Sequence, residues 1–168
     1  MIIIIMYVLF SFLLDCLMSN YVGMSIGSFS YFRTIYSVIS LVIIYNYFDN
    51  DNKYLKILIV LGFLFDIVYT NTLLINIFIF LIIYFMIKLL NEYIPNNLVT
   101  ISIKSLIAIS IYHILSYLIL LLAHYDNYSY KLLLTELRSS IIMTIIYTLI
   151  SYILISKVYF KKYDKKIK

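Results

Sequence analysis

The sequence predicts an all-α fold, a polytopic integral membrane bundle of about six transmembrane helices with both termini in the cytoplasm. Of the 168 residues, 64% are apolar and only 12% are charged, whereas soluble domains average about 45–50% apolar and about 25% charged residues. The mean hydropathy is +1.02. A globule made from this chain would have too little polar surface to face water. A water-soluble domain, a disordered chain and a nucleic-acid-binding domain are therefore excluded.

The second observation is the length and number of the apolar stretches. A helix needs about 20 mostly apolar residues to cross a hydrocarbon core of about 30 Å. Six stretches meet or nearly meet this length, at residues 2–19, 31–48, 54–69, 73–90, 101–123 and 139–156. The first stretch lacks a basic start and a small-residue cleavage site, so we expect it to be retained as a helix. We predict one transmembrane domain over residues 1–156 and a basic cytoplasmic tail over residues 157–168.

The third observation is the distribution of basic residues, which sets the predicted orientation. Alternating connections gather ten lysines on one side of the membrane, namely Lys53, Lys56, Lys88, Lys104 and the tail residues Lys157, Lys161, Lys162, Lys165, Lys166 and Lys168. Only Arg33, Lys131 and Arg138 fall on the other side. Because basic residues are retained in the cytoplasm, both termini are predicted there. The tail lysines are expected to bind anionic lipid head groups, at about 1 kcal/mol each, or else an acidic cytosolic partner.

Two aspartates, Asp15 and Asp66, fall inside predicted helices. An ionised Asp near a helix centre costs about 2.5–3.5 kcal/mol on insertion scales. Each is therefore expected to face protein, a partner charge or water. Arg33 and Arg138 open their helices on the outer side and are the candidate counter-charges.

The third and fourth predicted helices must form an antiparallel hairpin, because only a short polar turn joins them. Asp66 and Asn76 each lie five positions from Asn71 in this turn, so they are expected at the same depth and within hydrogen-bonding reach. Gly62, one turn before Asp66, would let another helix approach closely. The sequence leaves three roles open for Asp66: a buried carboxyl that fixes helix packing, a proton- or ion-coupling group, or a contact with a partner membrane protein.

The last two predicted helices carry stripes of small polar side chains. One arc of the fifth helix holds Ser102, Ser105, His113 and Ser116, and a narrower arc of the sixth holds Ser140, Thr144, Tyr147 and Ser151. Small hydroxyl side chains permit close helix contact and interhelical hydrogen bonds of about 0.6 kcal/mol each. These faces are therefore expected to pack within the bundle or against a partner.

The sequence offers no constellation for catalysis or metal binding. It contains no HExxH, no GxSxG, no Gly-rich phosphate loop and no Cys with a nearby His. His113 has no second His, Cys or carboxylate one turn away, so it is expected to be a buried imidazole and not a metal ligand. We expect no enzymatic activity, no cofactor and no metal.

The central hairpin resembles that of the MreD family of bacterial rod shape-determining proteins, which are small and have about five or six spans. The likeness lies in residues 61–67 (LGFLFDI), the polar turn and residues 74–78 (LINIF), with matches at Gly62, Asp66 and Asn76. The chain departs from the family in lacking a proline at the start of the second helix and extra glycines beside the Asp hairpin. The hydropathy pattern is similar along the whole chain.

The resemblance implies a non-catalytic adaptor of the cell-elongation machinery in the bacterial cytoplasmic membrane. It implies an MreC-like partner and, through it, an MreB-like filament, RodA and a class B penicillin-binding protein, with membrane lipids around the bundle and no nucleic acid. The alternative function is a small transporter or a substrate-capture subunit like that of an energy-coupling-factor uptake system. The connection at residues 20–30, with Gly23 and Gly27, would be its cover. The first helix, however, lacks the Ala-x-x-x-Ala face typical of those subunits.

Overall fold

The computed structural model describes residues 2–24, 34–48, 50–70, 74–124 and 129–164, and over these ranges the chain contains helices and no strand. The α-helices are α1 (Ile2–Met24), α2 (Tyr36–Tyr45), α3 (Asp51–Phe65), α4 (Ile75–Tyr93), α5 (Leu98–Leu122) and α6 (Tyr130–Asp164). A π-helical turn, η2 (Asp66–Thr70), continues α3. The predicted all-α class and the predicted number of helices are confirmed.

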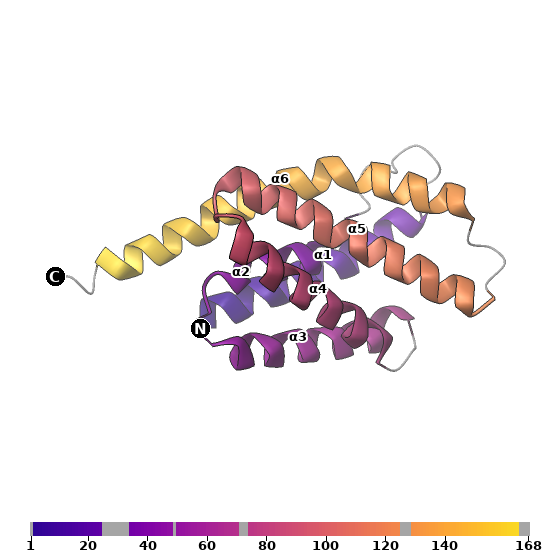
Figure 1. The fold of residues 1–168 in the computed structure, drawn as a ribbon, viewed down its shortest axis with the longest axis horizontal. Coiled ribbons are helices and arrows are strands. Elements are labelled where there is room, and N and C mark those ends of the chain that lie inside the picture. The colour runs from indigo at the N-terminus through magenta and orange to yellow at the C-terminus, as the bar shows by residue number, and fades with distance from the viewer. Residues whose placement is uncertain (1, 25–33, 49, 71–73, 125–128, 165–168) are drawn as a thin grey trace.

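Successive helices run up and down in one bundle (Figure 1). The start of α1 and the end of α6 point toward the same end of the molecule, as the prediction of two termini on one side requires (Figure 1). The first turns of α3 and α5 and the last turns of α4 lie at the same end (Figure 1), which we call the basic end. These turns contain Lys53, Lys56, Lys104 and Lys88. Residues 157–164 of the predicted tail continue α6 past the other helices.

Four helical segments are long and apolar enough to cross a membrane: Ile2–Ser19, Ile75–Tyr93, Leu98–Leu122 and Tyr130–Lys157. The prediction of a full-length span at residues 31–48 is wrong, because α2 has only 10 residues. At 1.5 Å per residue α2 is about 15 Å long, roughly half the thickness of the hydrocarbon core. The apolar run predicted a span, but apolar residues also continue into non-helical backbone at both ends of α2.

The short α2 is the centre of the bundle. Every residue from Tyr36 to Ile44 is buried, and Val38, Ile39, Leu41 and Ile43 have no exposed surface. The helix packs against α1, α5 and α6. A helix that is apolar on all sides is stable only when neighbours surround it, and the longer helices provide this cover. Their outward faces carry the large exposed apolar side chains.

Candidate functional site

The buried interior of the bundle contains Asp66 and Asn76, two of the residues that the sequence singles out. Asp66 has no exposed surface and Asn76 is 1% exposed. The Oδ1 atom of Asp66 accepts hydrogen bonds from the Asn76 backbone N–H at 2.9 Å and from its side-chain Nδ2 at 3.0 Å. The Tyr112 hydroxyl of α5 donates to Asn76 Oδ1 at 2.8 Å. One hydrogen-bonded cluster therefore joins η2, α4 and α5.

Asp66 also satisfies the start of α4. The first four N–H groups of a helix have no partner within the helix, and Asn76 is the second residue of α4. Leu74, which precedes α4, has a positive φ of 73° and offers no side-chain cap. The carboxylate of the preceding helix takes the place of a local cap, and the partial positive charge of the helix start favours it there.

At Gly62 the backbones of α3 and α4 approach each other closely. A Cβ atom at this position would lie 2.8 Å from Ile77 Cα, 2.9 Å from Ile77 Cγ1 and 3.0 Å from the Ile77 nitrogen. Two of these three atoms belong to the backbone, so a side-chain rotation cannot make room. The close approach expected at Gly62 is thus present, and its partner is α4 at Ile77.

Asp15 accepts hydrogen bonds from the backbone at the start of α2, as Asp66 does at the start of α4. Its two carboxylate oxygens accept hydrogen bonds from the backbone N–H groups of Tyr36 at 2.7 Å and Ser37 at 2.9 Å. These are the first two residues of α2. Asp15 is 7% exposed. Its carboxylate therefore faces protein, as expected, and backbone amides hold it.

The sequence suggests Arg33 and Arg138 as counter-charges for the buried aspartates. Arg33 lies outside the described residues. Arg138 is exposed on the surface of α6. The structure therefore places the Arg138 guanidinium away from the buried carboxylates.

The stripe on α6 faces the interior of this chain. Ser140, Thr144 and Ser151 are at most 2% exposed. Thr144 and Thr34 form a hydrogen bond of 2.7 Å between their hydroxyls, and the Tyr147 hydroxyl lies 2.8 Å from Ser11 Oγ. The stripe therefore ties α6 to α1 and to the segment that leads into α2.

On α5, Ser102, Ser105 and His113 are buried, whereas Ser116 is partly buried. His113 Nδ1 lies 3.5 Å from Glu136 Oε2 of α6. Sequence analysis missed Glu136, because it assigned residues 124–138 to a polar connection. Only the extension of α6 back to Tyr130 brings this carboxylate beside the imidazole.

Lys104 is the second residue whose role the sequence did not reveal. It was assigned only to the basic side, yet it is 1% exposed. Its ammonium donates hydrogen bonds to Asn91 Oδ1, to the Ile94 carbonyl at 2.9 Å and to Asn96 Oδ1 at 2.6 Å. Asn91 in the last turn of α4 and Asn96 in the connection to α5 are the signal that could have located it, because they supply the neutral oxygens that a buried ammonium needs.

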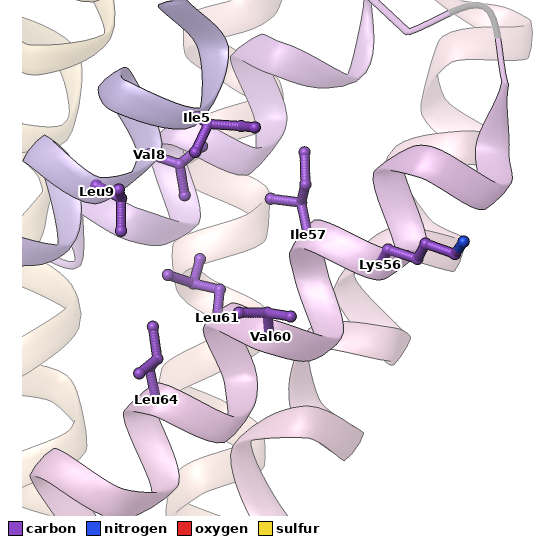
Figure 2. A pocket seen from close by; sticks show the side chains of 8 residues that line it. All are labelled: Ile5, Val8, Leu9, Lys56, Ile57, Val60, Leu61 and Leu64. Atoms are coloured by element: carbon purple, nitrogen blue, oxygen red, sulfur yellow. The ribbon is translucent and has the colours of Figure 1, made fainter. Parts of the chain in front are cut away.

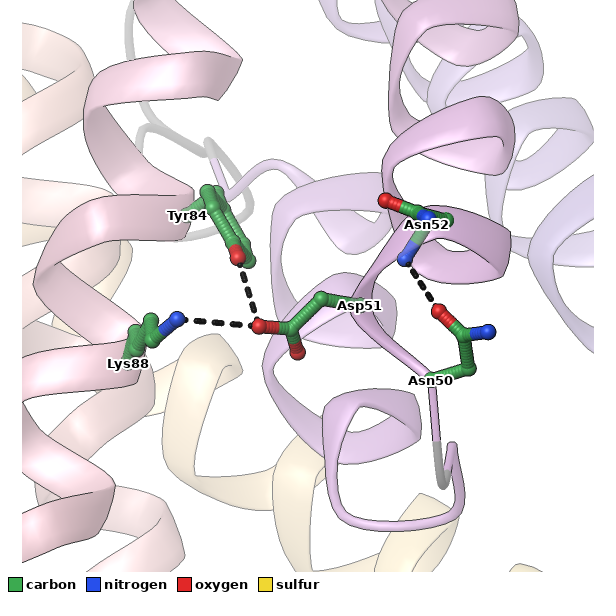
Figure 3. Close-up of polar contacts among 5 residues, drawn as sticks. All are labelled: Asn50, Asp51, Asn52, Tyr84 and Lys88. Atoms are coloured by element: carbon green, nitrogen blue, oxygen red, sulfur yellow. Dashed lines mark hydrogen bonds and ion pairs between the residues drawn. The ribbon is translucent and has the colours of Figure 1, made fainter.

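A polar group outside the apolar interior joins α3 to α4 at the basic end (Figure 3). Asp51 Oδ2 accepts hydrogen bonds from Lys88 Nζ at 2.9 Å and from the Tyr84 hydroxyl at 3.0 Å. The hydrogen bonds from Lys88 and Tyr84 hold the pKa of the Asp51 carboxyl below its usual value. Beside it, the Asn50 side chain accepts a hydrogen bond from the Asn52 backbone N–H at 2.8 Å and caps α3.

The described residues include the first part of the predicted lipid-binding tail. Lys157 is exposed on α6. Lys161 and Lys162 belong to the last turns of α6, and their side chains lie outside what the structure describes, as do all of Lys165, Lys166 and Lys168. Lipid contact by the tail stays a prediction.

Among the buried polar groups described above, Asp15, Asp66, Asn76 and the Lys104 ammonium are engaged in hydrogen bonds within the chain. Among the residues that the structure describes, no three His, Cys, Asp or Glu side chains come close enough together to hold a metal ion. No protein-family model, no curated protein and no solved structure matches this chain.

Proposed function

We propose that this chain is a non-catalytic adaptor of the bacterial cell-elongation machinery, embedded in the cytoplasmic membrane and acting through lateral helix contacts. One observation carries the proposal. The interior polar side chains of Asp15, Asp66, Asn76 and Thr144 bond to other segments of the same chain, and the outward faces are apolar. Contact with other membrane proteins would therefore use apolar helix surfaces.

These outward surfaces form stripes at helical spacing. The exposed apolar residues are Met6, Phe10, Leu13 and Leu17 on α1, Phe78, Phe85 and Leu89 on α4, and Ile142, Ile146 and Ile150 on α6. Residues three, four or seven positions apart lie on one face of a helix. Large exposed apolar patches mark sites of contact with lipid or protein. Each stripe is a candidate surface for an MreC-like partner.

Replacing the exposed apolar residues of each outward stripe with alanines, one stripe at a time, tests the proposal. Partner capture is measured by co-isolating the tagged chain with its MreC-like partner in mild detergent. We expect one triple or quadruple variant to lose the partner, while the other stripes serve as matched controls with unchanged cores. Retention of the partner by all three variants would contradict contact through these faces.

Depletion of the protein in its own host tests the cellular role. The adaptor proposal expects rod-shaped cells to become round, and expects Asp66→Asn to preserve both abundance and cell shape, because an amide retains an acceptor for the start of α4. Saturable uptake of a solute, or a small molecule that co-purifies with the chain, would instead favour the transporter alternative. Loss of cell shape in Asp66→Asn at normal abundance would favour proton or ion coupling.

A further inference from the structure

A narrow groove runs between α1 and α3 at the outer surface of the bundle (Figure 2). Its volume is about 250 Å³. Seven of its eight lining side chains are apolar, namely Ile5, Val8, Leu9, Ile57, Val60, Leu61 and Leu64, and the eighth is Lys56. Val8 and Leu61 form a buried floor, while Ile5, Leu9 and Val60 form an exposed rim. The groove therefore opens outward.

The dimensions of the groove favour one kind of occupant. From Lys56 to Leu64 the groove follows α3 for nine residues, a rise of about 12 Å. A helix segment of this length occupies about 900 Å³, several times the groove's volume of about 250 Å³. An α-helix with side chains is at least about 10 Å wide, which is a cross-section of about 80 Å². A single extended hydrocarbon chain fits this space, and a helix does not enter it.

The charge at the end of the groove identifies the class of molecule. Lys56 stands at one end of the row of apolar side chains, with its nitrogen directed away from them (Figure 2). Among the described residues, Lys56 Nζ forms no ion pair, whereas Lys88 at the same end pairs with Asp51. The long side chain of a lysine can bury its stem in an apolar surface and hold its charge at the head-group level. An apolar slot that ends at an unpaired ammonium complements an acyl chain attached to an anionic head group.

We propose that the groove between α1 and α3 binds one acyl chain of an anionic glycerophospholipid from the leaflet at the basic end, with the lipid phosphate on Lys56. This site is separate from the tail lysines and from the stripes proposed for partner contact, because Phe85, Ile146 and Phe10 do not line it. Lipid binding in the groove and partner contact through the apolar stripes can therefore be tested independently.

Native mass spectrometry of the full chain, released from detergent, tests the proposal. The probes are phosphatidylglycerol and phosphatidylcholine with identical palmitoyl and oleoyl chains. We expect wild-type protein to retain one phosphatidylglycerol in preference to phosphatidylcholine. Lys56→Gln should weaken this retention about five-fold, the equivalent of the roughly 1 kcal/mol that one lysine contributes at an anionic surface. Lys53→Gln is the matched control, because Lys53 is exposed on the same helix and does not line the groove.

A second variant tests the slot itself. Val60 is 59% exposed on the rim, so Val60→Phe should fill the groove without disturbing the core. We expect Val60→Phe to abolish the retained lipid, and Ile59→Phe, an exposed neighbour outside the groove, to leave it unchanged. Wild-type retention by Val60→Phe, equal retention of the two lipids, or equal losses in Lys53→Gln and Lys56→Gln would overturn the proposal.

Discussion

In both the α1–α2 pair and the α3–α4 pair, an aspartate from the earlier helix accepts hydrogen bonds from the backbone at the start of the later one. In the first pair, Asp15 reaches Tyr36 and Ser37 with both oxygens. In the second, a single oxygen of Asp66 reaches both the backbone and the side chain of Asn76. The same chemistry therefore anchors a short central helix in one pair and a long outer helix in the other.

The difference between the pairs lies in what else supports the capped helix. The α4 helix has 19 residues, and Gly62 and Tyr112 give it further contacts at its first turns. The α2 helix has 10 residues, and Ile35 at its start offers no side-chain cap. Short helices depend on tertiary contacts, because few internal hydrogen bonds repay the cost of forming the first turn. The bundle should therefore depend more on Asp15 than on Asp66.

Replacing each of the two aspartates with alanine tests whether the bundle depends more on Asp15. Asp15→Ala leaves two buried N–H groups of α2 without their acceptor, and we expect it to lower the free energy of unfolding by about 3 kcal/mol. Asp66→Ala should cost about 2 kcal/mol, because fewer backbone groups lose their acceptor. Reversible unfolding in detergent micelles or bicelles measures both values.

Asparagine variants separate the hydrogen bonds from the rest of the side chain. Asp15→Asn has the same shape and retains one oxygen, so it should recover roughly half of the stability lost in Asp15→Ala. If Asp66→Ala proves more damaging than Asp15→Ala, the argument from helix length is wrong.

The two pairs also differ in how much the sequence could predict. Asp66 and Asn76 are 10 residues apart across a short turn, so equal spacing from Asn71 was enough to place them together. Asp15 and Tyr36 are 21 residues apart, and nothing in the spacing indicates that α2 begins inside the bundle. Hydropathy predicts that a stretch is apolar, but it does not distinguish a membrane-crossing helix from a short helix enclosed by others. For this reason the six helices were predicted and the length of the second was not.

A similar limit applies to the buried charges. The sequence predicts that a charged residue in an apolar run needs a partner, but the partner is fixed by tertiary structure. Lys104 finds neutral oxygens in a connection, and His113 finds Glu136 on the next helix. Neither pairing follows from residues one turn apart, which is the range over which a single helix can be analysed.

Gly62 provides a close helix contact in the α3–α4 pair, and among the described residues of α1 and α2 no glycine contact of this kind is seen. Alanine is more favourable than glycine within a helix by about 1 kcal/mol, so Gly62→Ala would normally stabilise α3. Here the new Cβ would lie 2.8 Å from the Ile77 backbone, and we expect a net loss of about 1–2 kcal/mol from overpacking. Thermal unfolding in detergent measures the sign.

The partner residue provides the control for Gly62→Ala. Because the nearest atom is Ile77 Cα, shortening this side chain in Ile77→Ala should not restore the stability of Gly62→Ala. A stabilising Gly62→Ala variant would show that the two backbones can separate at little cost, and the close approach would then not distinguish this pair.

Removing one tyrosine hydroxyl beside each helix pair compares the contribution of a single hydrogen bond in the two regions. Tyr112→Phe removes the hydrogen bond to Asn76 beside α3 and α4, and Tyr147→Phe removes the one to Ser11 beside α1 and α2. Interhelical hydrogen bonds in membranes contribute about 0.6 kcal/mol on average. We expect Tyr147→Phe to cost less than Tyr112→Phe, because Ser11 keeps its bond to the Tyr7 carbonyl at 2.9 Å.

The two variants are compared under the same detergent conditions, again by reversible unfolding. Each changes one oxygen and leaves the ring in place, so the difference between them reports the hydrogen bond. A larger loss in Tyr147→Phe would mean that the α1–α6 contact carries more of the stability than the cluster around Asn76.

The smallest expected effect is the pH dependence of the ion pair at the basic end, which belongs to the α3–α4 pair. The pKa of Asp51 is lower in the folded chain than its unfolded value of about 3.9, chiefly because Lys88 donates a hydrogen bond to it. The ionised carboxylate therefore stabilises the fold above about pH 4, and this contribution is lost as the pH falls through the lower folded pKa. Asp51→Asn should melt slightly below wild type at pH 7, and the difference in Tm should vanish in acid. Since both side chains are 43% exposed, salt should reduce the difference at neutral pH. An acid-independent difference in Tm would mean that Asp51 acts through its packing, and that the charge of Lys88 does not help to join α3 to α4.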